Sequence, residues 1–499
     1  MPTSIDNLSL DLIAEIGEYL SLKELCQLKS TAKFFKLPID KLLIKKLPSQ
    51  RVKQIAIGET YTLFLQQDGS VWTCGDNQSS FSKVPIDGVK QIIAEGGNIY
   101  FIRTDGSVWA CGDNGDGQLG IGNCDRQHNP IKVPIDDVMQ VIAVCDQHLR
   151  HTHTFFLKTD GSVWACGYAA NGQMGEPLIR IASGRLGYGE QEYQRTDSDT
   201  LIKVPIDNVK EVIAKGDHTI FLKADGSVWA CGNYHVGINN VQKQAQSNLI
   251  KVPIKDVQQV IAEDDHTFFI KADGSVWAWG DNEYGQLGVK RDAREKPIKI
   301  SLDNVKEVIA KGNHTFFIKA DGSLWKCGRS LWEQDDDGSP NFVKLPFKHI
   351  KQVIDKVYTL FIETDGSVWK CKKHYFEATI DDESASDESE SDEDESSESA
   401  FIKLPFDNVQ QVIAKCNHGF FLKSDGSIWA WGENEEGQLG LGHKNKVVGL
   451  QPIPRYQKLQ AILQQLQEEN RQSQAQIAKG PTSNSHVGVN SASKRAKYG

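Results

Sequence analysis

A five-residue pattern, Asp-Gly-Ser-x-Trp, recurs eight times along the 499 residues of this chain. Self-similarity at intervals of a few tens of residues is typical of repeat folds, in which each repeat packs against its neighbours. The chain is also too long for one ordinary hydrophobic core. The pattern therefore predicts a repeat array. The triplets begin at Asp68, Asp105, Asp160, Asp225, Asp273, Asp321, Asp365 and Asp425.

One complete repeat can be followed through residues 202–232. It contains four short runs rich in β-branched and aromatic residues: Ile-Lys-Val-Pro-Ile-Asp, Val-Lys-Glu-Val-Ile-Ala, His-Thr-Ile-Phe-Leu-Lys and Ser-Val-Trp-Ala-Cys-Gly. The Asp-Gly between the last two runs predicts a tight hairpin, because glycine adopts positive φ without steric cost. Four short strands per repeat are the content of one propeller blade.

The strand pattern indicates sheets that are covered on both faces. Phe155, Phe156 and Leu157 are consecutive and all apolar, although alternate residues of a strand point to opposite faces. We therefore expect an all-β propeller of seven or eight four-stranded blades, with the repeat tryptophans buried in its core. The repeat count favours eight. Seven is the alternative if the weak copy at 351–380, which lacks the usual glycine after its cysteine, is displaced from the ring.

Closure of the ring is predicted from the two ends of the array. Residues 44–48 read Ile-Lys-Lys-Leu-Pro and echo the first run of a repeat, and residues 447–454 follow the last hairpin. We expect one terminal strand to complete the other's blade.

The ten cysteines follow the repeat. Six stand two residues after a repeat tryptophan, where Trp279 and Trp431 take the same position in the other two repeats. A position that accepts Cys or Trp is an apolar packing slot. Disulfides are not expected, no Cys-x-x-Cys spacing indicates zinc, and a reducing compartment is predicted. The six are Cys74, Cys111, Cys166, Cys231, Cys327 and Cys371.

Five histidines also occupy one repeat position, seven residues before an Asp-Gly-Ser aspartate, where Tyr61, Asn98 and Tyr358 stand in the other repeats. Symmetric copies around a ring cannot converge on one ion, so we expect buried histidines hydrogen-bonded to the backbone. We expect no metal site, no cofactor and no catalytic residues. The five are His153, His218, His266, His314 and His418.

The net charge of −10 has a local source. Residues 381–399 hold eleven acidic residues and no lysine or arginine, and the rest of the chain is nearly neutral. This balance disfavours nucleic-acid binding, and no apolar run is long enough to span a membrane. Residues 381–399 are expected to be a disordered insert, and residues 176–200 form a second insert. Ser384, Ser389 and Ser391 each precede an acidic residue by three positions, the pattern that acidophilic kinases phosphorylate.

The first 43 residues differ in kind. Apolar residues fall at helical spacing, and Ser21 with Glu24 forms a capping box. The segment from Leu8 to Phe35 resembles an F-box, although Ser9 stands where that family usually has proline. The resemblance implies docking on a Skp-type adaptor of a cullin ubiquitin ligase. The adaptor-binding residues we expect are Leu8, Leu12, Ile16, Leu20, Leu25 and Leu28.

The repeats resemble those of the regulator of chromosome condensation family. The matching pieces are the His-Thr-Phe-Phe strand, Asp-Gly-Ser-Val-Trp, and Gly-Asp-Asn-Glu-Tyr-Gly-Gln-Leu-Gly at 280–288. The resemblance implies a propeller but leaves function open, because such propellers include exchange factors, ligase subunits and light sensors. The expected layout is a helical module at 1–43, a propeller at 44–454, an amphipathic helix at 455–478 and a disordered tail at 479–499.

Three functions are compatible with these features. The first is the substrate-receptor subunit of a Skp–cullin–F-box ligase, in which the propeller binds a protein substrate. The second is a guanine-nucleotide exchange factor or regulator for a Ran-like small GTPase, and the third is a protein-interaction scaffold. A non-catalytic role is expected in the ligase and scaffold cases. We expect a cytoplasmic or nuclear protein, or one in the host cytoplasm if the source is a bacterium or a virus.

Overall fold

The computed structural model describes residues 51–145, 152–168, 174, 198–215, 218–232, 246–263, 266–290, 296–328, 342–355, 359–371, 401–415 and 417–456. These residues belong to one compact unit, Gln50–Tyr456. The predicted helical module at 1–43 and the tail at 479–499 lie outside the described residues. Of the helix predicted at 455–478, only Arg455 and Tyr456 are described.

The chain forms eight antiparallel sheets of four strands each. Blade 1 contains β1 (Val52–Ile57), β2 (Tyr61–Gln66), β3 (Val71–Gly75) and β4 (Gln78–Lys83). Blade 2 contains β5 (Val89–Glu95), β6 (Asn98–Arg103), β7 (Val108–Gly112) and β8 (Gln127–Lys132). Blade 3 contains β9 (Val138–Cys145), β10 (Thr152–Lys158), β11 (Val163–Gly167) and β12 (Ser198–Lys203). Blade 4 contains β13 (Val209–Lys215), β14 (His218–Lys223), β15 (Val228–Gly232) and β16 (Gln246–Lys251).

The second half of the ring repeats this plan. Blade 5 contains β17 (Val257–Glu263), β18 (His266–Lys271), β19 (Val276–Gly280) and β20 (Ile298–Lys299). Blade 6 contains β21 (Val305–Lys311), β22 (His314–Lys319), β23 (Leu324–Gly328) and β24 (Val343–Lys344). Blade 7 contains β25 (Ile350–Asp355), β26 (Thr359–Glu363), β27 (Val368–Cys371) and β28 (Phe401–Lys403). Blade 8 contains β29 (Val409–Lys415), β30 (His418–Lys423), β31 (Ile428–Gly432) and β32 (Val447–Pro452).

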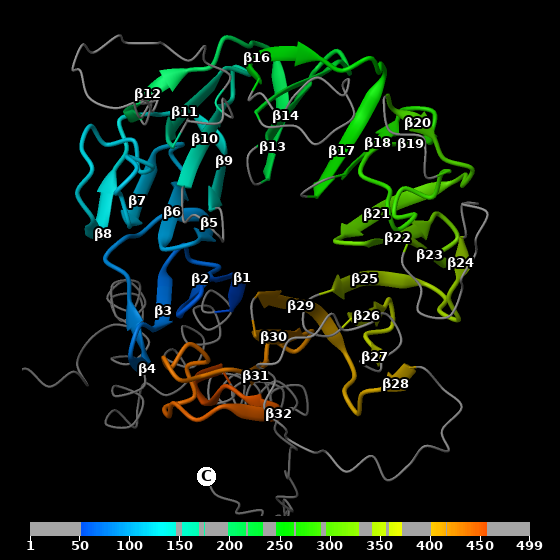
Figure 1. Ribbon diagram of the computed structural model, residues 1–499. Helices are drawn as coiled ribbons and strands as arrows, with labels where there is room; N and C mark the ends of the chain where they lie inside the picture. The colour runs from blue at the N-terminus through cyan, green and yellow to red at the C-terminus, as the bar shows by residue number, and fades with distance from the viewer. Residues whose placement is uncertain are drawn as a thin grey trace, which may run out of the picture. The chain divides into compact units, whose positions relative to one another are not determined.

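The blades surround a common axis, and the first strand of each blade lies nearest to it (Figure 1). The fold is an eight-bladed β-propeller, as the repeat count predicted. The seven-bladed alternative is wrong, because the weak copy at 351–380 supplies three strands of blade 7. Its third strand ends at Cys371, which pairs with Phe401 of β28 even though the usual glycine is missing.

The predicted exchange of a terminal strand between the first and last blades is not observed. Each blade takes its four strands from one continuous stretch of chain, and β32 completes blade 8 itself. Residues 44–48 lie outside the described residues. Aromatic packing closes the ring instead: the Phe64 ring lies 5.5 Å from Phe420 and 5.7 Å from Tyr456, and the Arg455 guanidinium lies 3.7 Å from the Trp72 ring centre.

The repeat read from residues 202–232 does not coincide with one blade. Its first run belongs to β12, which pairs with β11 of blade 3 through Trp164 and Lys203. Its remaining three runs form β13, β14 and β15 of blade 4. The third strand of each blade carries the repeat tryptophan, and the fourth strand pairs with it before the chain enters the next blade. A sequence repeat that starts with a fourth strand therefore spans two neighbouring blades.

Phenylalanines, rather than the repeat tryptophans, fill the core. Phe155, Phe156 and Phe221 are fully buried between blades. Each of the eight repeat tryptophans is partly buried and lies at the edge of the core, so the prediction that they are buried in the core is met only in part. The physical reason is that the indole faces the outer strand, where a lysine stands directly opposite in seven blades. The amino group of Lys251, for example, lies 6.0 Å from the Trp229 ring centre, within reach of a cation–π attraction.

The two ends of the propeller differ in what they carry. At one end, called the insert end, each first strand turns into the second and each third strand connects to the fourth. The other end, called the Asp-Gly end, carries the eight Asp-Gly-Ser turns. Among the described residues, no helix is both long and apolar enough to cross a membrane.

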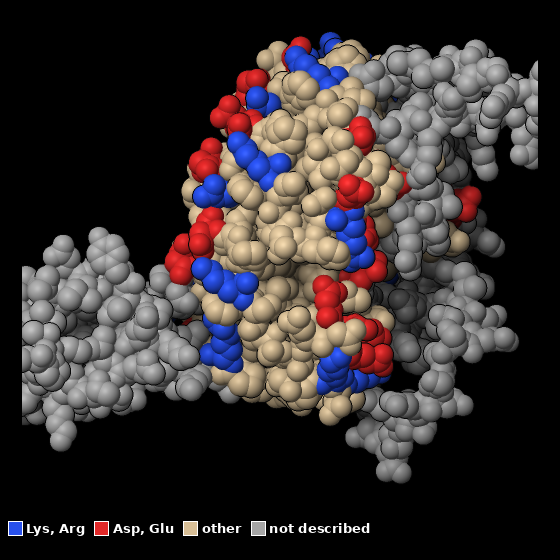
Figure 2. Space-filling model, turned by 90° about the vertical axis from the view of Figure 1, so that its left-hand side faces the viewer, with Lys and Arg blue, Asp and Glu red and all other residues tan. Residues whose placement is uncertain are grey.

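The outer side of the ring carries charges of both signs. Basic and acidic side chains lie next to one another along it (Figure 2). Three such ion pairs join an outer strand to the turn that follows it: Lys83–Asp87 at 2.9 Å, Lys132–Asp136 at 3.0 Å and Lys203–Asp207 at 3.2 Å. All six side chains are largely exposed, so these ion pairs contribute little to the free energy of unfolding. They do keep the outer surface of the ring from carrying charge of only one sign.

Candidate functional site

Both predicted inserts leave the propeller at the insert end. The connection between β11 and β12 spans most of the predicted insert at 176–200, and the connection between β27 and β28 spans the predicted insert at 381–399. Loops carry most binding residues of a propeller, because most side chains of the strands pack against neighbouring blades. The insert end is therefore the place to look for a functional site.

Three described loops at this end share one structure, here called the clasp. The loops run over residues 114–122, 282–288 and 434–442 and contain Gly-Gln-Leu-Gly. In each, the side-chain oxygen of the leading asparagine accepts a 3.0 Å hydrogen bond from the leucine backbone, as in Asn114 and Leu119. The leucine itself is fully buried.

Each clasp reaches the next blade and contacts its repeat cysteine. The Cys166 thiol lies 3.1 Å from the Gln118 carbonyl oxygen, and Cys327 lies 3.3 Å from that of Gln286. The same contact joins Cys74 to Gln438 across the ring closure at 3.3 Å. Burial raises the pKa of these thiols far above the ordinary value, so they remain protonated donors.

Tryptophan takes the slot in two blades, as Trp279 in blade 5 and Trp431 in blade 8, and neither preceding blade has a Gly-Gln-Leu-Gly loop. Blades 1 and 6 also lack this loop, but cysteine stands in the slot of the blades that follow them, so absence of the loop does not by itself select tryptophan. In blade 8 the Trp431 ring fills the space beside Gly419, which replaces the usual threonine: a Cβ there would lie 2.2 Å from the ring. The prediction that this position is a packing slot is confirmed by burial of the six cysteines, which are free thiols.

The repeat histidines are mostly buried at the start of each second strand. Burial lowers the pKa of His153 and of His418 to about 4, so both are neutral near pH 7. The predicted backbone hydrogen bond is not found for their Nε2 atoms, which are buried without a partner among the described residues. His314 bonds a carboxylate instead, with Nε2 2.6 Å from Oδ2 of Asp355. Within the described part of the chain, no cluster of residues could hold a metal ion.

Ion pairs at the insert end connect different blades. Glu263 of blade 5 lies 3.7 Å from Lys215 of blade 4 and 3.1 Å from Lys311 of blade 6. Lys415 of blade 8 reaches Glu95 of blade 2 at 2.8 Å. Ion pairs thus connect the ends of the inner strands of different blades.

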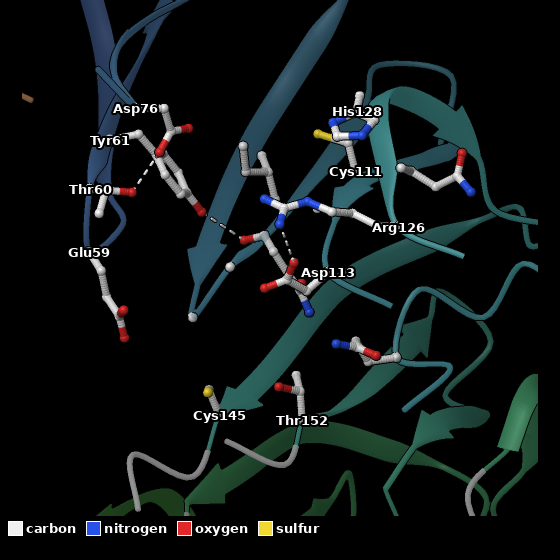
Figure 3. A pocket seen from close by; sticks show the side chains of 17 residues that line it. Glu59, Thr60, Tyr61, Asp76, Cys111, Asp113, Arg126, His128, Cys145 and Thr152 are labelled. Atoms are coloured by element: carbon white, nitrogen blue, oxygen red, sulfur yellow. Dashed lines mark hydrogen bonds and ion pairs between the residues drawn. The ribbon is translucent and has the colours of Figure 1, made fainter. Parts of the chain in front are cut away.

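A pocket of about 390 Å³ opens at the insert end among blades 1, 2 and 3. Its buried residues include Tyr61, Asn98, Cys111 and Thr152, and the Tyr61 hydroxyl donates a 3.1 Å hydrogen bond to the Asn98 carbonyl oxygen. Figure 3 shows these strands with the charged side chains around the opening. The exposed charged residues are Glu59, Asp76, Asp113 and Arg126.

One hydrogen bond and one ion pair hold the rim of this pocket. The Thr60 hydroxyl donates to Asp76 at 2.6 Å, and Arg126 pairs with Asp113 at 3.1 Å. Both members of the ion pair are more than half exposed, so each can exchange its partner for a ligand at small cost.

The residues proposed from sequence for adaptor binding and phosphorylation lie outside the described residues, and so remain predictions. They are Leu8, Leu12, Ile16, Leu20, Leu25, Leu28, Ser384, Ser389 and Ser391. The pocket residues were not predicted. The one sequence feature that could have indicated this site is Asn98, which interrupts the histidine pattern. The charged residues of the rim could not be recognised from sequence, because they come from three separate loops.

The fold defines the class: this is an eight-bladed β-propeller, and four of its segments match models of a known repeat. Residues 105–149, 273–318 and 425–478 match the family described as "Regulator of chromosome condensation (RCC1) repeat". Residues 52–80 match a second family of the same description. The first two of these matches begin at an Asp-Gly-Ser turn and run into the next blade, so the family's repeat, like the one read from sequence, straddles two blades.

Solved structures with a similar fold come from yeast and human. Yeast RCC1 (Prp20), in a crystal structure with Kap60, is 21% identical over 70% of this chain and 83% of that chain, with a TM-score of 0.46. Human WBSCR16 is 18% identical over 75% of this chain and 84% of that chain, with a TM-score of 0.45.

Proposed function

We propose that this protein is a non-catalytic binding protein whose propeller holds a protein partner at the insert end. One observation carries the proposal: departures from the repeat gather at that end. The two long connections, the clasps, the inter-blade ion pairs and the pocket among blades 1, 2 and 3 lie there. The Asp-Gly end repeats one turn eight times and holds a pocket of about 470 Å³ beside Asp321 and His349. Residues at the repeated positions pack in the core, so residues at non-repeated positions must make the contacts that recognise a partner.

The finer form we favour is regulation of a small GTPase of the Ran class. Its support is the RCC1 repeat itself, whose family namesake is an exchange factor for such a GTPase. An exchange factor needs no catalytic side chain of its own, because it acts by binding the GTPase more tightly without nucleotide than with it.

The test is nucleotide release from a purified Ran-like GTPase loaded with a fluorescent GDP analogue. We expect the full-length protein to accelerate release. Glu283→Arg, an exposed residue of the blade 5 clasp, should slow the accelerated rate roughly tenfold, because it inverts a charge at the insert end. Asp303→Arg makes the same charge change at the Asp-Gly end and should leave the rate unchanged. No acceleration by the unmodified protein would remove this function.

The second candidate is the ligase receptor, which the N-terminal sequence pattern favours. Co-purification of the full-length protein with a Skp-type adaptor tests it. Leu20→Asp and Leu25→Asp should abolish co-purification, because each places a charge on the apolar face expected to dock. Lys494→Asp, in the polar tail, is the control and should retain the adaptor. An adaptor that is not retained by the unmodified protein would exclude this candidate.

A further inference from the structure

The first strand of every blade contains a bulge at its second residue. The pairing between the first and second strands skips one residue there, as at Lys53 between Val52 and Gln54. A residue skipped in this way is left out of the hydrogen-bond ladder, and its side chain is re-aimed. The eight skipped residues, here called the bulge ring, are Lys53, Lys90, Met139, Lys210, Gln258, Lys306, Lys351 and Gln410.

The bulge ring surrounds the axis of the propeller. The first strands lie nearest to that axis (Figure 1), and all eight bulge residues are exposed. The ring lies toward the Asp-Gly end, because the first strands begin there. It is therefore a repeat position whose side chains the core does not use, in contrast to the cysteine and histidine positions.

The bulge ring is positively charged. Five of its eight members are lysines, and none is acidic. Lys90 and Lys306 donate no hydrogen bond and form no ion pair within the described part of the chain. The other three lysines each donate one hydrogen bond to the backbone carbonyl oxygen of the next bulge, which fixes the ammonium group and leaves further N–H donors for a ligand. These bonds join Lys53 to Lys90 at 2.9 Å, Lys210 to Gln258 at 3.0 Å and Lys351 to Gln410 at 2.6 Å.

Two carboxyl groups adjoin the ring on the first strands. Glu211 and Glu307 each follow a ring lysine, and both are partly buried. Burial raises the pKa of both carboxyl groups, and the preceding lysine opposes the rise. At this level of the first strands, five ammonium groups therefore meet only two carboxyl groups.

The turns that lead into the first strands carry balanced charge and do not neutralise the ring. Three of their aspartates pair with lysines of the outer strands, as described above. Asp256 lies 4.0 Å from Lys271 of a second strand. The other acidic and basic residues of these turns are equal in number and exposed: Asp137, Asp303, Asp407, Arg51, Lys255 and Lys348.

We propose that the bulge ring binds a compact molecule that carries several phosphate groups. Lysines on separate strands around one axis repel each other, and an anion on the axis attracts all of them at once. One phosphate monoester carries a charge of about −1.5 to −2 and three acceptor oxygens, so several of them on a small frame match five ammonium groups. The site does not depend on the proposed function, because it lies away from the insert end.

The test titrates the full-length protein with myo-inositol hexakisphosphate by calorimetry at low ionic strength. We expect saturable binding at one site, roughly a hundredfold or more tighter than that of inorganic phosphate, and weaker binding as salt is added. Linear tripolyphosphate forms a separate arm. Tighter binding of the inositol compound assigns the site to a ring-shaped carrier of phosphates, and tighter binding of tripolyphosphate assigns it to a linear one.

Lys90→Gln combined with Lys306→Gln is the decisive variant. Glutamine stands at this position in blades 5 and 8, so the protein should fold, and the two lysines removed make no hydrogen bond that holds blades together. We expect at least roughly tenfold loss of affinity for the inositol compound with an unchanged thermal unfolding midpoint. Lys255→Gln combined with Lys348→Gln removes the same charge from the turns at the same end and should change affinity less than roughly twofold.

Absence of saturable binding, full affinity in the Lys90 and Lys306 variant, or equal losses in the two double variants would each overturn the proposal. A variant that unfolds at a lower temperature but keeps full affinity would assign the ring a structural role alone. These results are independent of the GTPase and adaptor assays, which use protein partners. A protein that accelerates nucleotide release but ignores polyphosphates loses only the bulge-ring site.

Discussion

The thiol of Cys166 donates a hydrogen bond to the backbone carbonyl oxygen of Gln118, which lies 3.1 Å away in the preceding blade. The contact shows how two recurring sequence features depend on each other. The Gly-Gln-Leu-Gly loop of one blade covers the cysteine of the next, and Gly120 allows the approach, since a Cβ there would lie 3.0 Å from the thiol sulfur. Neighbouring blades are therefore joined by loop packing as well as by their sheet faces.

The clasp predicts that Cys166 cannot be replaced by the tryptophan that fills the same slot elsewhere. Cys166→Trp should lower the free energy of unfolding by about 3 kcal/mol, because the clasp already occupies the space. Urea unfolding followed by circular dichroism measures the effect. Cys124→Trp, at an exposed cysteine, is the matched control and should change stability little. Equal stability of the two variants would contradict the packing role of the clasp.

Gly419 and Trp431 should be energetically coupled. Gly419→Thr restores the usual repeat residue but drives its Cβ into the indole, and should destabilise the protein by about 2 kcal/mol. In a Trp431→Cys background the same substitution should cost less, because the ring is gone. A double-mutant cycle measured by urea unfolding gives the coupling. Additive effects would show that the two positions are independent. Rescue should be partial, since the Cβ would also lie 2.7 Å from the Ile413 carbonyl oxygen.

Buried histidines should make the propeller less stable as pH falls. The pKa of His153 is about 4 in the folded protein, against 6.5 for an ordinary histidine. The unfolded chain therefore binds more protons between these values, and the free energy of unfolding decreases as pH falls from 6.5 toward 4. For one such group the full change is on the order of 3 kcal/mol.

Urea unfolding at about pH 7 and about pH 4.5 measures this dependence. His153→Asn installs the residue found at the same position in blade 2 and should reduce the difference between the two pH values. His418→Asn should act in the same direction, because the pKa of His418 is lowered to about 4 as well. A pH dependence unchanged in both variants would assign the effect to other groups.

The ring closure should depend on Tyr456. Its ring is buried against Phe64 and Phe81 of blade 1, at centroid distances of 5.7 and 5.8 Å. Tyr456→Ala should cost about 3–5 kcal/mol by leaving a cavity between blades 8 and 1. Hydrogen exchange should then accelerate in β1, β2 and β30 more than in β17 and β18 on the far side of the ring. Uniform acceleration would indicate global destabilisation rather than opening of the closure.

Several features of the fold could be predicted because they recur. The eight Asp-Gly-Ser turns, the paired apolar strands and the cysteine slot each appear many times, so chance variation at one copy does not hide the pattern. The mode of ring closure could not be predicted, because it depends on contacts between β1–β3 and residues 420–456, which are far apart in sequence. The partial burial of the tryptophans was missed for a similar reason: the opposing lysine of the outer strand sets it.

The candidate pocket was predictable only in part. The sequence marks Asn98 as an exception among the histidines, but an exception alone does not indicate a pocket. Asp113 and Arg126 come from one loop and Glu59 from another, and only the packing of blade 1 against blade 2 brings them around the same opening.

The sequence by itself determined that the chain is a ring of repeats and favoured eight blades over seven, because each repeat is a local unit whose strands and turns are specified by short-range pattern. It also marked the first 43 residues and the two inserts as different from the ring. The tertiary structure decided how the ring closes, that the ring has eight blades and not seven, that both inserts leave the propeller at one end, and that residues of blades 1, 2 and 3 line one pocket. Those relations depend on which loops meet across blade boundaries, and no local pattern in the chain encodes such a meeting.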